Sequence, residues 1–99
     1  MNHAIFVVKV IKNPVHLIYN DDQIIEIKVQ FSVPQSNTSK NELTLVLWGD
    51  YRDNFLKYYK VRDYLIIEGI ITLKGYKNEG NEGNEVRVIV KRLYPFLLV

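Results

Sequence analysis

A strict alternation of apolar and polar residues in the first half of the chain constrains its fold most strongly. Apolar residues at positions 25, 27, 29, 31 and 33 alternate with Glu26, Lys28, Gln30 and Ser32. Successive side chains of a β-strand point to opposite faces of a sheet, so this period of two predicts a strand with one buried and one exposed face. A β-rich fold organised around this strand is therefore expected.

Four further segments also predict strands. Each is rich in β-branched or other apolar residues, as strands are. The first is expected to stop at Asn13-Pro14, because proline cannot donate a hydrogen bond to a ladder. The four segments are Ala4–Lys12, Leu43–Trp48, Tyr64–Lys74 and Val86–Lys91.

One helix is expected between the third and fourth strands, from Asp50 to about Lys60. There the apolar positions change from a period of two to helical spacing. Asp50 is the expected N-cap, because its carboxylate can accept amide protons of the first turn. The residues on the helical face, all expected to pack against the core, are Tyr51, Phe55, Tyr58 and Tyr59.

The segments between these elements differ in character. Asn20-Asp21 predicts a turn, and the polar residues 34–41 predict a loop. Residues 77–85 repeat Glu, Gly and Asn and predict a mobile hairpin tip, whose carboxylates at 79, 82 and 85 should repel phosphates. The tail Leu93–Val99 is apolar and is expected to be covered by its own barrel, a second copy or a partner.

The composition excludes several classes of protein. Ninety-nine residues suit one domain, and the net charge of +2 permits nucleic-acid binding without requiring it. The absence of cysteine excludes disulfides and favours a reducing, intracellular compartment. No apolar run is long enough to span a membrane. Abundant Lys, Asn, Ile and Tyr, whose codons are AT-rich, suit an AT-biased genome such as an organelle's.

Catalysis and cofactor binding are not expected. His3 and His16 lie in different segments, and neither has a partner at metal-ligand spacing. No glycine-rich phosphate loop precedes a helix, because Gly80 and Gly83 fall in the expected hairpin tip. The sequence therefore predicts a protein without enzymatic activity, metal or cofactor.

The order of the elements is three strands, one helix and two strands. This order matches a five-stranded OB-fold barrel, an all-β fold with one short helix between strands 3 and 4, formed here by residues 1–99 as one domain. A small α+β sandwich has the same number of strands and stays open as an alternative.

Several short motifs in this order resemble the bacterial-type single-stranded DNA-binding protein family, which includes small plastid and cyanobacterial relatives. The motifs are the strand from Asn2 to Pro14, the step Leu47-Trp48-Gly49 and the run Ile67-Glu68-Gly69. The resemblance covers nearly the whole chain. It implies an OB fold and non-catalytic binding of single-stranded DNA, with a basic residue at Lys74 and a base-stacking aromatic at Tyr76.

The sequence also departs from the family pattern. Val8 replaces a usual glycine, Glu42 replaces a frequent tryptophan, and Val61-Arg62-Asp63 replaces a basic-glycine turn. The chain also reaches Val99 without the acidic C-terminal tip that recruits replication partners in full-length members. Even if DNA binding is kept, that recruiting role is not expected.

Side-chain parity places the candidate binding residues on one face. In the strand 64–74, Leu65, Ile67, Ile71 and Leu73 are expected to face inward, and the residues at 72, 74 and 76 outward. Sequence-tolerant binding of single strands needs exposed aromatic rings and positive charges along the backbone path. The predicted nucleic-acid-binding residues are Trp48, Tyr76, Lys74, Lys28 and Arg87.

Two hypotheses about function follow. The first is a DNA-binding module acting in DNA replication, with RNA as a possible ligand, weak salt-sensitive affinity and a dimeric or tetrameric homo-oligomer. The second is an OB-fold accessory subunit of a larger protein assembly with little nucleic-acid binding, because OB folds host many functions. The expected location is the plastid stroma or the bacterial cytoplasm.

Overall fold

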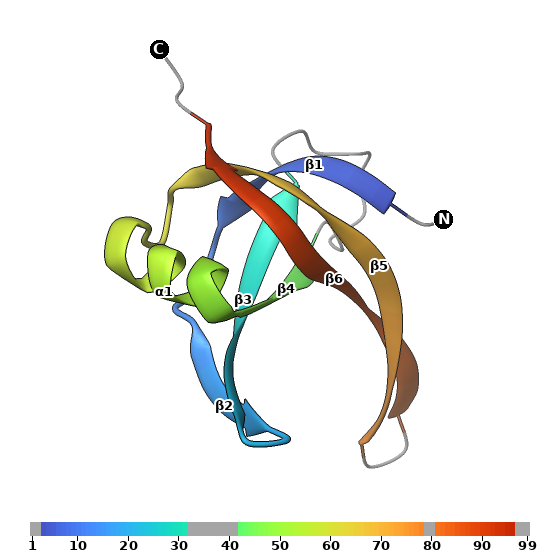
Figure 1. The fold of residues 1–99 in the computed structure, drawn as a ribbon. Coiled ribbons are helices and arrows are strands. Elements are labelled where there is room, and N and C mark those ends of the chain that lie inside the picture. The colour runs from blue at the N-terminus through green and yellow to red at the C-terminus, as the bar shows by residue number, and fades with distance from the viewer. Residues whose placement is uncertain (1–2, 32–41, 79–80, 97–99) are drawn as a thin grey trace.

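The computed structural model describes residues 3–31, 42–78 and 81–96, and only the backbone of residues 76–78 and 81–84. The described residues form six strands and one helix, arranged in space as Figure 1 shows. Their order along the chain is β1 (His3–Val10), β2 (Val15–Tyr19), β3 (Asp22–Phe31), β4 (Glu42–Trp48), α1 (Gly49–Tyr58), β5 (Tyr64–Asn78) and β6 (Asn81–Pro95).

Five of these strands close into a ring. The sheet order is β1-β5-β6-β4-β3, and β3 pairs with β1 to complete the circle. All neighbours are antiparallel except β4 and β6, which run parallel. A closed five-stranded barrel with a helix between its third and fourth strands is the OB fold that the element order predicted.

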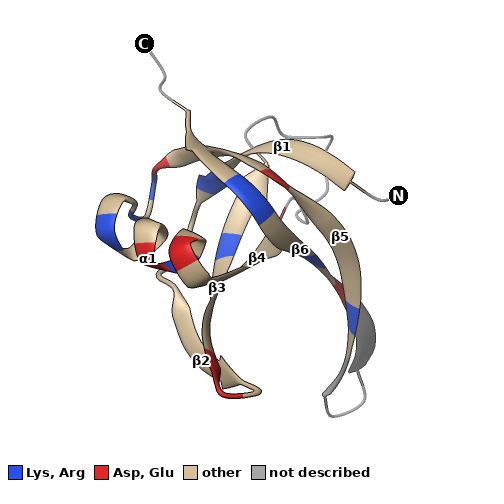
Figure 2. Cartoon of the chain, in the orientation of Figure 1, with Lys and Arg blue, Asp and Glu red and all other residues tan. Residues whose placement is uncertain are grey.

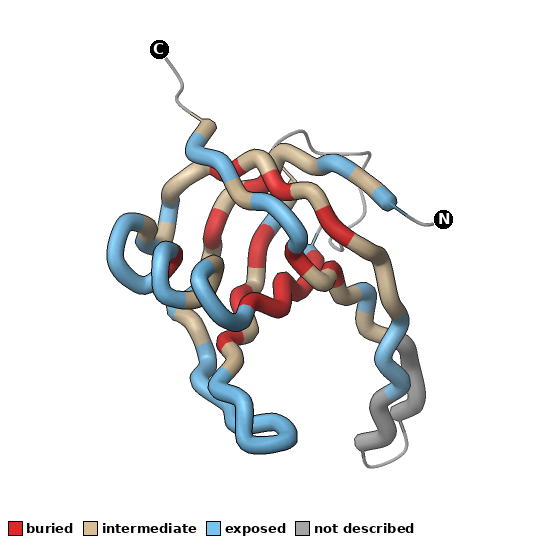
Figure 3. The backbone as a smooth tube through the Cα atoms, viewed as in Figure 1, coloured by how far each residue is buried: buried red, intermediate tan, exposed pale blue. Residues whose placement is uncertain are grey.

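The core lies inside this barrel and contains the inward-facing residues of every ring strand (Figure 3). The alternation correctly predicted burial at Ile25, Ile27 and Val29, which are fully buried; Phe31 is half-buried, and Val33 lies outside the described residues. Burying each such side chain contributes roughly 1.5–3 kcal/mol. Among the described residues, the core cluster consists of Val8, Val10, Ile25, Ile27, Val29, Leu43, Leu45, Leu47, Phe55, Leu65, Ile67, Val88 and Val90.

The helix packs on this core through a narrower face than the sequence predicted. Phe55 is buried, and Tyr51 and Tyr59 pack against the core as expected, but Tyr58 is exposed. The N-cap is Trp48 rather than Asp50, and no side chain caps the first turn. Gly49 begins the helix with a φ of 61°, a conformation that glycine adopts without steric cost.

The strand β2 was not predicted. It pairs only with β3, through a turn in which Asn20 and Asp21 both have positive φ, as type I′ hairpin turns require. The expected strand 4–12 ends earlier, at Val10, and the chain resumes as β2 after Pro14. A stretch of five residues, four of them apolar, between that proline and the predicted turn at Asn20-Asp21 was the available signal.

The last two strands are longer than expected. Their ladder continues to the pair Asn78 and Asn81, so most of the expected hairpin tip at 77–85 is strand, and residues 79–80 lie outside the described residues. Ladder hydrogen bonds need only backbone groups, so a stretch without apolar side chains can still form them. Residues 93–95 of the expected tail pair with β5, and residues 97–99 lie outside the described residues.

A bulge between Glu68 and Gly69 interrupts the pairing of β5 with β6. Here the two strands approach so closely that a Cβ on Gly69 would lie 2.3 Å from the carbonyl oxygen of Ile89. Beyond this point the hairpin leaves the barrel, and Leu73, which was expected to face the core, is 65% exposed. The prediction for Leu73 was wrong because the strand outruns the barrel that would cover it.

Candidate nucleic-acid interface

A groove of about 660 Å³ runs between two projecting parts of the sheet. We call residues 15–24 of β2 and β3 the N-terminal arm, and residues 72–78 and 81–86 of β5 and β6 the C-terminal arm (Figure 1). The groove is lined by Leu17, Ile18, Tyr19, Asn20, Asp22, Ile24, Glu26, Val46, Trp48, Lys74, Arg87 and Ile89. Three of the predicted binding residues, Trp48, Lys74 and Arg87, therefore line one groove.

Trp48 is the exposed aromatic residue at one end of the groove. It is the last residue of β4, opposite Ile24 of β3, and the chain turns away from the sheet at Gly49. Its indole is 44% exposed, and the ammonium group of Lys91 lies 5.7 Å from the ring centroid. A base stacked on this ring would therefore have a positive charge nearby for its phosphate.

The N-terminal arm adds a second aromatic that the sequence analysis missed. Tyr19 is 66% exposed and Ile18 is 75% exposed, although both belong to a regular strand. Because β2 was not predicted, neither residue was expected to lie on a strand or on the binding face. The groove thus has an aromatic side chain on the arm and another at the end of β4.

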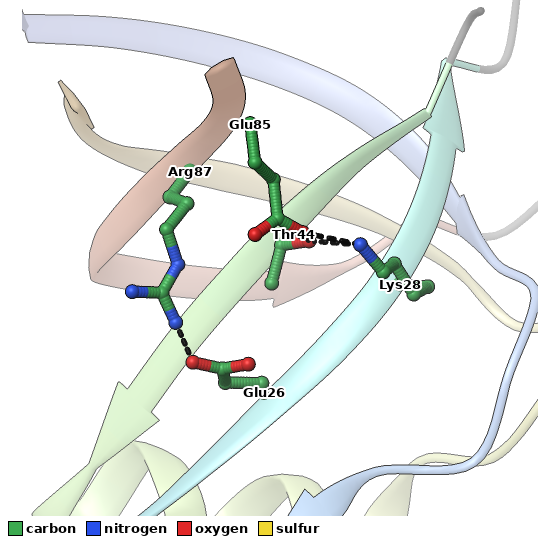
Figure 4. Close-up of polar contacts among 5 residues, drawn as sticks. All are labelled: Glu26, Lys28, Thr44, Glu85 and Arg87. Atoms are coloured by element: carbon green, nitrogen blue, oxygen red, sulfur yellow. Dashed lines mark hydrogen bonds and ion pairs between the residues drawn. The ribbon is translucent and has the colours of Figure 1, made fainter. Parts of the chain in front are cut away.

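Lys28 does not project freely from the sheet. Its ammonium group donates a hydrogen bond to the Thr44 hydroxyl at 2.8 Å and forms an ion pair with Glu85 (Figure 4). The Thr44 hydroxyl in turn donates to the Glu85 carboxylate at 2.6 Å. Three strands, β3, β4 and β6, therefore meet in one polar cluster beside the groove.

Glu85 is held in its ionised form by this cluster. Partial burial alone would raise the pKa of Glu85, but the hydrogen bonds from Lys28 and Thr44 and the charges of Lys28 and Lys74 outweigh it. The pKa of Glu85 therefore lies below its ordinary value, since interactions with the charged form favour that form.

Arg87 is paired in the same way with Glu26 of β3 (Figure 4). Its side chain is largely buried, and desolvation lowers the pKa of its guanidinium. The Nε atom is also buried and has no hydrogen-bond partner among the described residues. Arg87 thus lines the groove, but its guanidinium group is already paired with the Glu26 carboxylate.

Lys74 and Tyr76 belong to the C-terminal arm. Lys74 lies opposite Glu85 in the β5–β6 ladder and is exposed. Tyr76 lies two residues further along the same strand, opposite Gly83, and its side chain lies outside the described residues. The proposed stacking role of Tyr76 therefore stays a prediction.

Charge is nearly balanced around the groove. Asp22 and Glu26 line it together with Lys74 and Arg87. Asp21 and Asp22 lie at the turn of the β2–β3 hairpin. Figure 2 shows this tip as acidic and shows basic residues on β6. Such a surface offers less phosphate attraction than the residue types alone suggested.

Other chemistry finds no support in the described part of the chain. Within residues 3–31, 42–78 and 81–96, no group of three or more His, Asp or Glu side chains could hold a metal ion. No helix in those same ranges is long and apolar enough to cross a membrane.

Comparisons with known proteins agree with the fold. No family model matches the sequence. The chain is 28% identical, over 99% of its length and 91% of the other protein, to the Trieres chinensis protein named "Putative single-stranded DNA-binding protein ycf41".

Solved structures give the same result. The SSB domain of a Synechococcus protein superimposes with a TM-score of 0.71 at 22% identity, covering 95% of this chain and 94% of that one. The Plasmodium falciparum SSB in complex with single-stranded DNA gives a TM-score of 0.76 at 13% identity, covering 97% and 95%. The resemblance to the single-stranded DNA-binding protein family that the motifs predicted is thus confirmed by both sequence and fold.

Proposed function

We propose that this chain is a non-catalytic protein that binds single-stranded DNA in the groove between its two arms. The observation that carries the proposal is that two exposed aromatic residues, Trp48 and Tyr19, line one groove on the outer face of an OB barrel. The similarity to a protein named for single-stranded DNA binding supports it. Every base has a π face, so recognition by stacking does not depend on sequence.

The energetics of this site favour stacking over ion pairing. Each base stacked on an aromatic side chain contributes about 1–3 kcal/mol. Two of the predicted cations, Lys28 and Arg87, already pair with carboxylates. Lys74 is exposed, and so is Lys91, whose ammonium group lies near the Trp48 ring. We therefore expect modest affinity and a shallow dependence on salt.

The finer parts of the proposal extend beyond this groove. RNA is a second possible ligand, because stacking does not distinguish the 2′-hydroxyl. A role in DNA replication and a location in the plastid stroma or bacterial cytoplasm agree with the family resemblance and the AT-leaning residue usage. A homo-oligomer is supported by exposed apolar side chains outside the groove, including Ile5 on β1 and Tyr94 on β6, and sedimentation of the intact chain would test it.

The single tryptophan makes a direct test possible. Oligothymidylate of about 35 nucleotides spans several OB-fold sites. Titrating it into the protein should quench Trp48 fluorescence to saturation, and the affinity should fall when salt rises from about 50 to about 200 mM. Anisotropy of a labelled strand provides an independent readout.

Variants locate the effect. Trp48→Ala should weaken binding about 5- to 150-fold, which corresponds to the loss of one stacked base. Tyr58→Ala is the matched control, because Tyr58 is also an exposed aromatic residue, on α1, but does not line the groove. Absence of both quenching and anisotropy change would contradict the proposal and favour an accessory subunit of a protein assembly.

A further inference from the structure

One carboxylate beside the groove binds a lysine and lies opposite a second lysine. Glu85 pairs with Lys28 across the sheet, and Lys74 lies opposite it in the β5–β6 ladder. Its carboxylate accepts hydrogen bonds from both the Lys28 ammonium and the Thr44 hydroxyl. An ammonium group and a hydroxyl are donors that a phosphate oxygen of a nucleic-acid backbone would also use.

We propose that Glu85 occupies the position of a backbone phosphate and must be displaced from Lys28 when a strand binds. The inference rests on the proposed function and adds a regulatory element to the same site. Glu85 then competes with the ligand within the chain, and it sets the affinity below the value that the lysines alone would give.

Of the two ion pairs at the groove, Lys28–Glu85 and Arg87–Glu26, the first is the one that a ligand can more easily separate. Its side chains are 41% and 30% exposed, whereas those of Arg87 and Glu26 are 15% and 22% exposed. Partly exposed pairs contribute little net energy, so a phosphate can replace the carboxylate at small cost. Arg87 and Glu26 are more deeply buried, and separating them would leave charges without solvent or partner.

Removing the carboxylate should free a binding charge. Each additional phosphate contact to a single strand raises the salt slope by about 0.7, which corresponds to about eightfold tighter binding at 50 mM salt and about threefold at 200 mM. Glu85→Gln should therefore bind oligothymidylate more tightly than the unmodified chain, with a steeper salt dependence. The Gln side chain keeps an acceptor for the Thr44 hydroxyl, so the local fold should persist.

The control is Glu42→Gln, which removes one negative charge from an exposed residue of β4 outside the Lys28 cluster. A general charge effect would tighten binding equally in both variants. A second control, Lys28→Gln combined with Glu85→Gln, should lose most of the gain. Denaturant midpoints of all variants show whether the folded state is intact.

Each outcome is decisive. Tighter binding with a steeper salt slope only in Glu85→Gln confirms the inference. Unchanged or weaker binding by Glu85→Gln, when the unmodified chain binds, overturns the inference and leaves the proposed function standing. Absence of binding by every variant overturns the proposed function and the inference with it.

Discussion

The barrel and its two arms both carry apolar side chains on their strands, but only the barrel buries them. In the barrel, inward residues such as Ile27 and Leu45 are completely buried. In the arms, β2 is exposed along its whole length, and Leu73 extends beyond the closed ring. Apolar side chains in the arms therefore contribute little to folding, and another role must explain why they are there. The groove offers such a role, because a ligand can stack on these side chains.

Core truncation should give the largest contrast between two aromatic residues of α1. Phe55→Ala removes a buried ring that packs against Tyr59, with 5.7 Å between the ring centroids, and should destabilise the protein by about 3–5 kcal/mol. Tyr58→Ala, at an exposed position, should change the stability by no more than about 0.5 kcal/mol. Urea denaturation measures both, and equal effects would contradict the division of α1 into a buried and an exposed face.

Alanine substitutions at two glycines, one at the base of the C-terminal arm and one at the start of α1, test the backbone in each region. Gly69→Ala places a methyl group against the Ile89 carbonyl and a Val88 side chain at the base of the C-terminal arm, and should cost about 2–3 kcal/mol or more. Gly49→Ala meets no atom within 4 Å but keeps a positive φ, so it should cost only about 1–2 kcal/mol. A smaller loss for Gly69→Ala than for Gly49→Ala would disprove the close approach of β5 to β6.

Acid should reveal the contribution of Glu85. Because its folded pKa lies below the ordinary value of 4.5, its ionised form stabilises the fold above that pH, and the stability is lost as pH falls through the folded pKa. The unmodified chain should exceed Glu85→Gln in stability by at most about 1 kcal/mol near neutral pH, since the pair is partly exposed. The difference should shrink as pH falls below 4.5 and disappear once the pH lies below the folded pKa. A difference that instead grows in acid would show that the carboxylate is not held by Lys28.

The smallest expected effect lies in the turn before β5. Arg62 has a φ of 83°, and its amide donates to the Val10 carbonyl at 2.8 Å, so the turn is fixed against β1. The resemblance to the single-stranded DNA-binding protein family implies a glycine in this turn. Arg62→Gly should therefore stabilise the chain by up to about 1 kcal/mol, with Arg62→Asn intermediate, as measured by thermal unfolding. Destabilisation by both variants would mean that the Arg62 side chain contributes more than the strain costs.

The sequence predicted the barrel better than the arms, for a physical reason. Burial of one face imposes a period of two on the sequence, and this period indicated that Ile25, Ile27 and Val29 are core residues. In β2 no face is buried, so no alternation marks it, and only the flanking Pro14 and Asn20-Asp21 turn gave a signal. The same absence of burial explains the underestimated length of β5 and β6.

The sequence predicted several residues of the candidate site but not the ion pairs that join them. Parity along single strands was sufficient to place Trp48, Lys74 and Arg87 on one face. The Lys28–Glu85 contact joins residues 57 positions apart, and it depends on the register of β3, β4 and β6 together. That register is set by the closed barrel, so no local pattern could show that the groove's charges are already paired.

Mapping backbone amide shifts by NMR during a titration tests the central claim most directly. Oligothymidylate of about 15 nucleotides should cover one OB-fold site. The account predicts shifts concentrated along the groove, at Tyr19, Ile24, Trp48, Lys74 and Ile89, with none on the outer face of α1. Shifts confined to α1, or no shifts at saturating strand, would contradict the assignment of the groove between the arms as the binding surface.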